Sequence, residues 1–201
     1  MKSLIQVIAF DKLIRELGQL SPEEKLLNAF HAVRDIPYGG KSSQEPLRLF
    51  EKNEGTGRGK HRLLKQLVAS LGHDVRHLLC RHNLAELPID PWPEALAAFR
   101  GKTITGYHDF LRVKVGGRFV IVDATYDKPL TAIGFPLLEW DGKSDMDLPV
   151  QMEEIIEVQG DLAEERKALI AALPEQMQEE RKRFLRTMKE WIEETREKRE
   201  R

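Results

Sequence analysis

Apolar and polar residues recur with a helical period directly after a glycine-rich segment at residues 55–59. The apolar positions that mark this helix lie on one face: Leu63, Leu64, Leu67, Val68 and Leu71. Gly72 follows as a typical helix stop. The pattern predicts a helix whose first turn emerges from a flexible loop. Such an N-terminus offers unpaired backbone N–H groups and a partial positive charge, which suit an anion, a thiolate or a developing oxyanion.

A second pattern, strict enough to predict strand pairing, lies between residues 106 and 127. Two runs of β-branched and aromatic residues flank the glycine pair at 116–117, which is a strong hairpin signal. With a two-residue loop, counting outward places Phe110 opposite Asp123. His108 then shares a face with Asp123 and lies diagonal to it, about 7–8 Å away at the backbone. An imidazole and a carboxylate can meet across that distance.

Helical periodicity also marks the N-terminal part of the chain. It predicts a helix over residues 3–19 and a second helix that starts at Ser21-Pro22, a capping residue followed by proline at the first helical position. Residues 46–51 favour a short helix. Residues 74–81 favour a strand, which carries Cys80, the only cysteine.

The composition changes from Asp161 onward. Residues 161–201 hold 11 basic and 11 acidic side chains and favour two helices that meet at Pro174. One face of the second helix is apolar and consists of Met177, Phe184, Leu185, Met188, Trp191 and Ile192. We therefore expect an α+β domain over residues 1–150 and a charged helical extension over residues 151–201. The apolar face is expected to pack against that domain, with a homodimer through the C-terminal helix as the alternative.

Composition and charge narrow the classes of partner. The 201 residues carry 32 Lys and Arg against 33 Asp and Glu, and this formal charge of −1 favours neither nucleic acid nor an anionic membrane. A single cysteine excludes an intramolecular disulfide, and the N-terminal apolar stretch is too short for a signal peptide or a membrane span. We expect a cytoplasmic protein that binds no nucleic acid and no membrane and uses no cofactor.

The chain resembles the transglutaminase-like family of papain-like cysteine enzymes in four successive segments. These segments are the glycine-rich turn, the helix with its closing Leu-Gly, the strand with His108 and the following VDATYD segment. The resemblance covers roughly residues 25–130. It implies an α+β fold in which a central helix packs on an antiparallel sheet. In that family the helix N-terminus carries a catalytic cysteine, the first strand a histidine and the second strand an aspartate. His108 and Asp123 match the last two, whereas Gly57 stands at the position of the nucleophile.

Without a thiol at position 57, the covalent mechanism that the resemblance implies cannot begin. We therefore predict a catalytically inactive member that binds a peptide or small ligand in the inherited cleft. The alternative is a cysteine-type acyl transferase or hydrolase, either in a parent chain with cysteine at position 57 or in this chain, if Cys80 or a water attacks instead. In a third interpretation, His108 and Asp123 have only a structural role, as a hydrogen-bonded pair on a sheet.

Candidate ligand contacts gather near the start of the central helix. Glycine N–H groups together with Arg58 and Lys60 suit a carboxylate or sulfate-like anion. His61 follows Gly57 by four residues and so lies on the same helix face. Trp92, between two prolines, is a candidate cleft aromatic, with a tryptophan that covers the edge of the core as the alternative.

A metal site is the remaining alternative for the histidines. His61, His108 and Asp123 supply ligand types that zinc accepts. No segment has the spacing of a metal motif, however. We therefore expect His61 to be a packed, hydrogen-bonded histidine and expect no metal.

Overall fold

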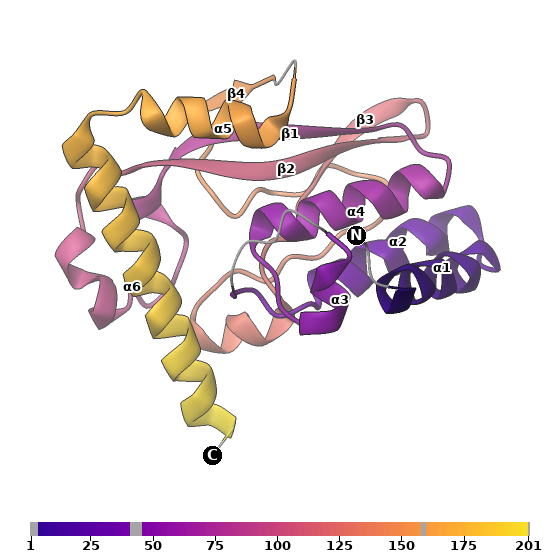
Figure 1. The fold of residues 1–201 in the computed structure, drawn as a ribbon, viewed down its shortest axis with the longest axis horizontal. Coiled ribbons are helices and arrows are strands. Elements are labelled where there is room, and N and C mark those ends of the chain that lie inside the picture. Colours follow the sequence, from indigo (N-terminus) through magenta and orange to yellow (C-terminus); the bar gives the residue numbers. More distant parts are fainter. Residues whose placement is uncertain (1–3, 41–45, 158–159, 201) are drawn as a thin grey trace.

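The computed structural model describes residues 4–40, 46–157 and 160–200. Its α-helices are α1 (Leu4–Gly18), α2 (Pro22–Arg34), α3 (Arg48–Lys52), α4 (Gly57–Ser70), α5 (Leu162–Ala171) and α6 (Glu175–Glu200). Its strands are β1 (Val75–Asn83), β2 (Thr105–Val115), β3 (Arg118–Val122) and β4 (Glu154–Ile156), and its 3₁₀ helices are η1 (Leu84–Glu86), η2 (Glu94–Phe99) and η3 (Lys128–Ile133). Figure 1 shows their arrangement.

The four strands form an antiparallel sheet in the order β3-β2-β1-β4. Helix α4 packs against β1 and β2, and α5 approaches the sheet where its Arg166 pairs with Asp109 of β2 (Figure 1). The face of α4 that the sequence predicts is buried, with Leu63, Leu64, Leu67 and Val68 inside the core. The expected α+β architecture, with a central helix on an antiparallel sheet and C-terminal helices, is thus confirmed.

The predicted hairpin is also confirmed. Strands β2 and β3 pair outward from Val115 and Arg118. The loop consists of residues 116–117, whose φ angles of 57° and 85° are open to glycine without strain. One step beyond the last paired residues, this register places Phe110 opposite Asp123, as the sequence indicates.

Helix α2 lies against α4 on the side away from the sheet, and α1 packs on α2 and α3 (Figure 1). Ser21 caps α2 as predicted: its side chain accepts the backbone N–H of Glu24, and the Glu24 carboxylate accepts the backbone N–H of Ser21. The buried face of α2 includes Phe30 and Val33. These helices complete the layer that holds α4 in place.

The C-terminal segment is built into the same core. Strand β4 pairs with β1 at the edge of the sheet, and α6 buries Phe184, Met188 and Ile192 in the core cluster. The apolar face of α6 therefore packs against its own chain. This position agrees with the expected packing of the helix on the domain, and the homodimer through the C-terminal helix stays a prediction. The division at residue 150 remains a prediction. Among the described residues, no helix is long and apolar enough to cross a membrane.

Candidate functional site

His108 and Asp123, which the resemblance marks as catalytic, are in direct contact. His108 Nε2 lies 2.5 Å from Asp123 Oδ2, and Asp123 Oδ1 accepts the backbone N–H of Thr125 at 2.8 Å. Asp123 is completely buried. Burial acts to raise the pKa of its carboxyl, but His108 and His61 outweigh it, so this pKa lies below its ordinary value. Because Nε2 faces the carboxylate, Nδ1 of His108 is the atom that can exchange a proton with a molecule in the cleft.

His61 joins the start of α4 to the chain that leaves β3. Its Nδ1 lies 2.8 Å from the carbonyl oxygen of Gly57, and its Nε2 accepts the backbone N–H of Ala124 at 3.2 Å. A carbonyl can only accept, so Nδ1 carries the proton and the imidazole is neutral. Burial lowers the pKa of His61 to about 4, which agrees with a neutral imidazole.

This placement agrees with the expected packed, hydrogen-bonded histidine and corrects the assignment of His61 as a candidate ligand contact. Its side chain is completely buried, and both ring nitrogens are bound to the backbone. It therefore has no free nitrogen to offer to a ligand or a metal, even though its ring centroid is only 6.2 Å from that of His108.

Lys60 likewise lies away from the cleft, contrary to the expectation from the sequence. Its side chain is fully buried, and its ammonium donates to the carbonyl oxygens of Arg34, Ile36 and Thr125 at 2.8–2.9 Å. Burial lowers the pKa of Lys60 to about 7. Three carbonyls match the three N–H donors of a charged ammonium. Lys60 thus ties α4 to the end of α2 and to the segment after β3.

Gly57 is the first residue of α4. The side chain of the preceding residue, Thr56, accepts the backbone N–H of Gly59 at 3.3 Å, which fixes the first turn of the helix. A Cβ added at Gly57 would lie 3.1 Å from Cγ2 and 3.3 Å from Oγ1 of Thr125. The Thr125 side chain therefore occupies the margin of the space into which a residue at position 57 would extend.

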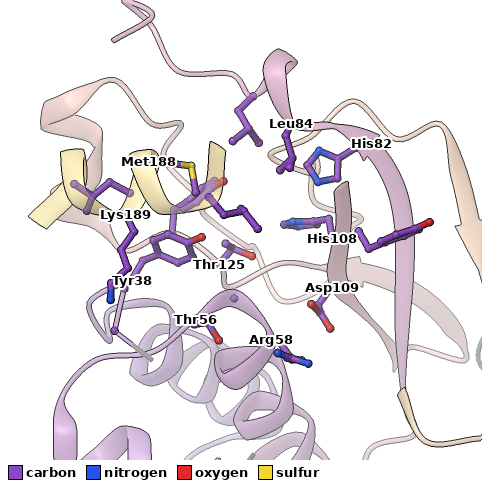
Figure 2. Close-up of a pocket in the computed structure, with 18 of the residues that line it drawn as sticks. Tyr38, Thr56, Arg58, His82, Leu84, His108, Asp109, Thr125, Met188 and Lys189 are labelled. Atoms are coloured by element: carbon purple, nitrogen blue, oxygen red, sulfur yellow. The ribbon is translucent and has the colours of Figure 1, made fainter. Parts of the chain in front are cut away.

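A cavity of about 280 Å³ opens over the start of α4 (Figure 2). The residues of its floor and walls come from the α4 N-terminus, β1, β2 and the segments after α2 and β3, and include Gly57, Arg58, His82, His108, Asp109 and Thr125. Helix α6 covers the cavity with Arg181, Leu185, Met188, Lys189, Ile192 and Glu193, and α5 adds Arg166. The structure thus brings together three of the predicted site residues: Gly57, Arg58 and His108.

Trp92 does not line this cavity. It is half-buried against the core, and its indole N–H donates to the carbonyl oxygen of Leu96 at 3.1 Å. This position corrects the expectation of a cleft aromatic and agrees with the alternative of a tryptophan at the edge of the core.

Cys80 is also outside the cavity. It lies directly opposite His108 in the β1–β2 ladder and is fully buried. Burial raises the pKa of its thiol to about 12. A thiol with this pKa is not a nucleophile near neutral pH. No thiol is found among the described residues that line the cavity.

Several cavity residues carry no obvious signal in the sequence. Asp109 pairs with Arg166 of α5 and lies 3.0 Å from Nε2 of His77. Burial acts to raise the pKa of the Asp109 carboxyl, but Arg166 and His77 outweigh it, and this pKa is far below its ordinary value. Only a residue next to a motif, such as Asp109 after His108, could have been suspected from the sequence. Arg166 and Arg181 reach the site through tertiary packing alone.

Comparisons with known proteins give partial structural likenesses. No family model matches the chain, and neither does a curated protein. A proposed cysteine protease from Cytophaga hutchinsonii aligns with 64% of this chain and 40% of its own chain, at 18% identity and a TM-score of 0.43. A protein described as a TGase aligns with 66% of this chain and 38% of its own, at 14% identity and a TM-score of 0.41. This chain thus spans about two fifths of the length of either structure.

Proposed function

We propose that this chain is a non-catalytic transglutaminase-like protein that binds a small ligand in the cavity beside His108. One observation carries the proposal: the chain has an ordered His108–Asp123 dyad but a glycine at the start of α4. The dyad can hold and orient a proton, but covalent catalysis also needs a nucleophile. Gly57 supplies none, and Thr125 packs against it.

The roof formed by α6 favours a small molecule over a peptide. Near its start, Lys102 Nζ lies 2.6 Å from Glu180 Oε1, and near its end Arg196 Nη2 lies 2.6 Å from Asp127 Oδ1. Between these ion pairs, Phe184 is fully buried. A helix held at both ends leaves little room for an extended chain to cross the cleft. The cavity volume also lies near the lower end of the range of small-molecule sites, about 300–1,000 Å³.

A cysteine-type acyl transferase or hydrolase is the second candidate, and the intact contact between His108 and Asp123 favours it. It requires a thiol at position 57, because Cys80 is buried and lies outside the cavity. We therefore assign that chemistry to a chain with cysteine at position 57, not to this one.

The native chain should hydrolyse p-nitrophenyl acetate no faster than its His108→Ala variant. Both rates should equal the background rate measured in buffer that contains an inert protein. This result is expected because His108 has no nucleophile to activate. The measurement is the initial rate at neutral pH, with an iodoacetamide-treated sample to detect thiol-dependent turnover. A native rate well above that of His108→Ala would show that a water or hydroxyl is activated, and it would overturn the proposal.

A further inference from the structure

Buried polar atoms without partners are concentrated in the cavity. Within the described part of the chain, six buried side-chain atoms make no hydrogen bond: His31 Nε2, Arg34 Nε, His82 Nδ1, Thr125 Oγ1, Arg166 Nε and Arg181 Nε. The first two lie 3.4 Å and 2.7 Å from carboxylate oxygens. The other four all belong to residues that line the cavity. Since buried polar atoms in folded proteins are nearly always paired, this grouping points to a ligand that supplies the missing partners.

The chemistry of the four atoms indicates what the ligand must offer. The Nε–H groups of Arg166 and Arg181 can only donate. The Thr125 hydroxyl can donate as well, and its side chain is only 3% exposed. His82 is 4% exposed, and burial lowers its pKa to about 3, so its imidazole is neutral and can donate or accept. A ligand group rich in acceptor oxygens satisfies all four atoms.

The charge around the cavity favours an anionic group. Its lining includes the cations Arg58, Arg166, Arg181 and Lys189 but only the carboxylates of Asp109 and Glu193. Asp109 is already engaged by Arg166 and His77. Burial, together with the nearby charges of Arg166 and Arg58, lowers the pKa of Arg181 to about 10, which indicates that these guanidinium groups repel one another. An anion among them would remove this repulsion, and the N-terminus of α4 faces the same space.

The lining of the cavity also includes apolar side chains. Leu185, Met188 and Ile192 of α6 line the cavity together with Leu84 and Leu87 of the segment after β1. In Figure 2, Met188 and Leu84 lie across the cavity from Arg58 and Asp109. The site therefore offers hydrocarbon close to donors and positive charge.

We propose that the cavity binds a small organic acid, whose carboxylate or phosphate lies among Arg166, Arg181, His82 and Thr125 and whose apolar part packs against Leu185, Met188 and Ile192. This inference rests on the proposed ligand-binding function and specifies the class of ligand. Guanidinium groups bind carboxylate and phosphate oxygens with similar geometry, so both acids are included.

The test is a titration followed by amide chemical shifts and calorimetry. The probes are phenylacetate, phenyl phosphate and the neutral analogue phenylacetamide. Either acid should shift resonances of cavity residues and bind at least tenfold more tightly than the amide. The ratio between the two acids then separates a carboxylate site from a phosphate site.

Variants of α6 provide the matched comparison. Arg181→Gln should weaken binding of the preferred acid at least tenfold and leave the amide unchanged. Arg186→Gln, an exposed arginine of the same helix that does not line the cavity, should change neither. The Arg181→Gln chain without ligand should be no less stable than the native chain, because it loses a repelled charge.

Three outcomes would overturn the inference, in distinguishable ways. If the amide binds in the cavity as tightly as the acids, or if Arg181→Gln and Arg186→Gln act alike, the acid specificity is wrong and the ligand-binding cleft stands. If no probe shifts cavity resonances, both the acid site and the proposed function lose their basis.

Discussion

Replacing Lys60 with methionine should lower the free energy of unfolding by about 3 kcal/mol or more. Methionine retains an apolar stem of similar length but leaves the carbonyls of Arg34, Ile36 and Thr125 without their shared donor. A buried acceptor without a partner costs about 1–3 kcal/mol. The loss is expected to be large because all three carbonyls depend on one side chain.

Urea unfolding at neutral pH measures this effect. Lys65→Met is the control, since Lys65 belongs to the same helix and is exposed. A loss of less than about 1 kcal/mol in Lys60→Met, or an equal loss in Lys65→Met, would contradict the role assigned to the buried ammonium.

The second large effect concerns pH. Through His61, the native chain should lose about 3 kcal/mol of stability between pH 7 and pH 4. The pKa of His61 is lowered from 6.5 to about 4 by burial. Between these values the unfolded chain binds a proton that the native chain does not, so acidification favours unfolding. Protonation of Nε2 would also break its bond from the Ala124 N–H.

A variant isolates the contribution of His61 to this pH dependence of stability. In His61→Gln, the amide oxygen can still accept the Ala124 N–H, but the side chain does not titrate, so the stability should fall less steeply from pH 7 to pH 4. His73→Asn, which changes a histidine outside the cavity region, should leave the slope as in the native chain. Equal slopes in the native chain and His61→Gln would refute the neutral, buried state of His61.

The sequence predicted those parts of the site that depend on local pattern. The glycine pair at 116–117 fixes the register of the hairpin, and this register alone brings His108 to Asp123. The start of α4 followed from its apolar period and the preceding glycines. Such features depend on neighbours in sequence, so periodicity and turn chemistry were sufficient.

The parts that the sequence did not predict depend on packing between distant segments. Lys60 and His61 stand in the motif region, yet the helix turns both side chains into the interior, where backbone groups of other segments bind them. Arg166 and Arg181 lie more than 100 residues from Gly57 and reach the cavity only because α5 and α6 fold over it. The mixed charge of α6 resembles an ordinary solvated helix, so nothing in its pattern marks Arg181.

The most direct test of the central claim, a catalytic frame without its nucleophile, is the reactivity of a thiol introduced at position 57. Gly57→Cys is combined with Thr125→Ser, which removes the methyl group that a Cβ would approach. The rate of iodoacetamide labelling is measured at mildly acidic pH, and the modified residue is located by mass spectrometry. Cys80 serves as the internal control, because it is buried and should remain unmodified.

We expect the introduced thiol to react at least tenfold faster than the same thiol in a chain that also carries His108→Ala. The reason is that the start of α4 and the imidazole together lower its pKa. Equal, slow labelling in both chains would mean that position 57 and His108 do not form a catalytic frame, and it would contradict the account.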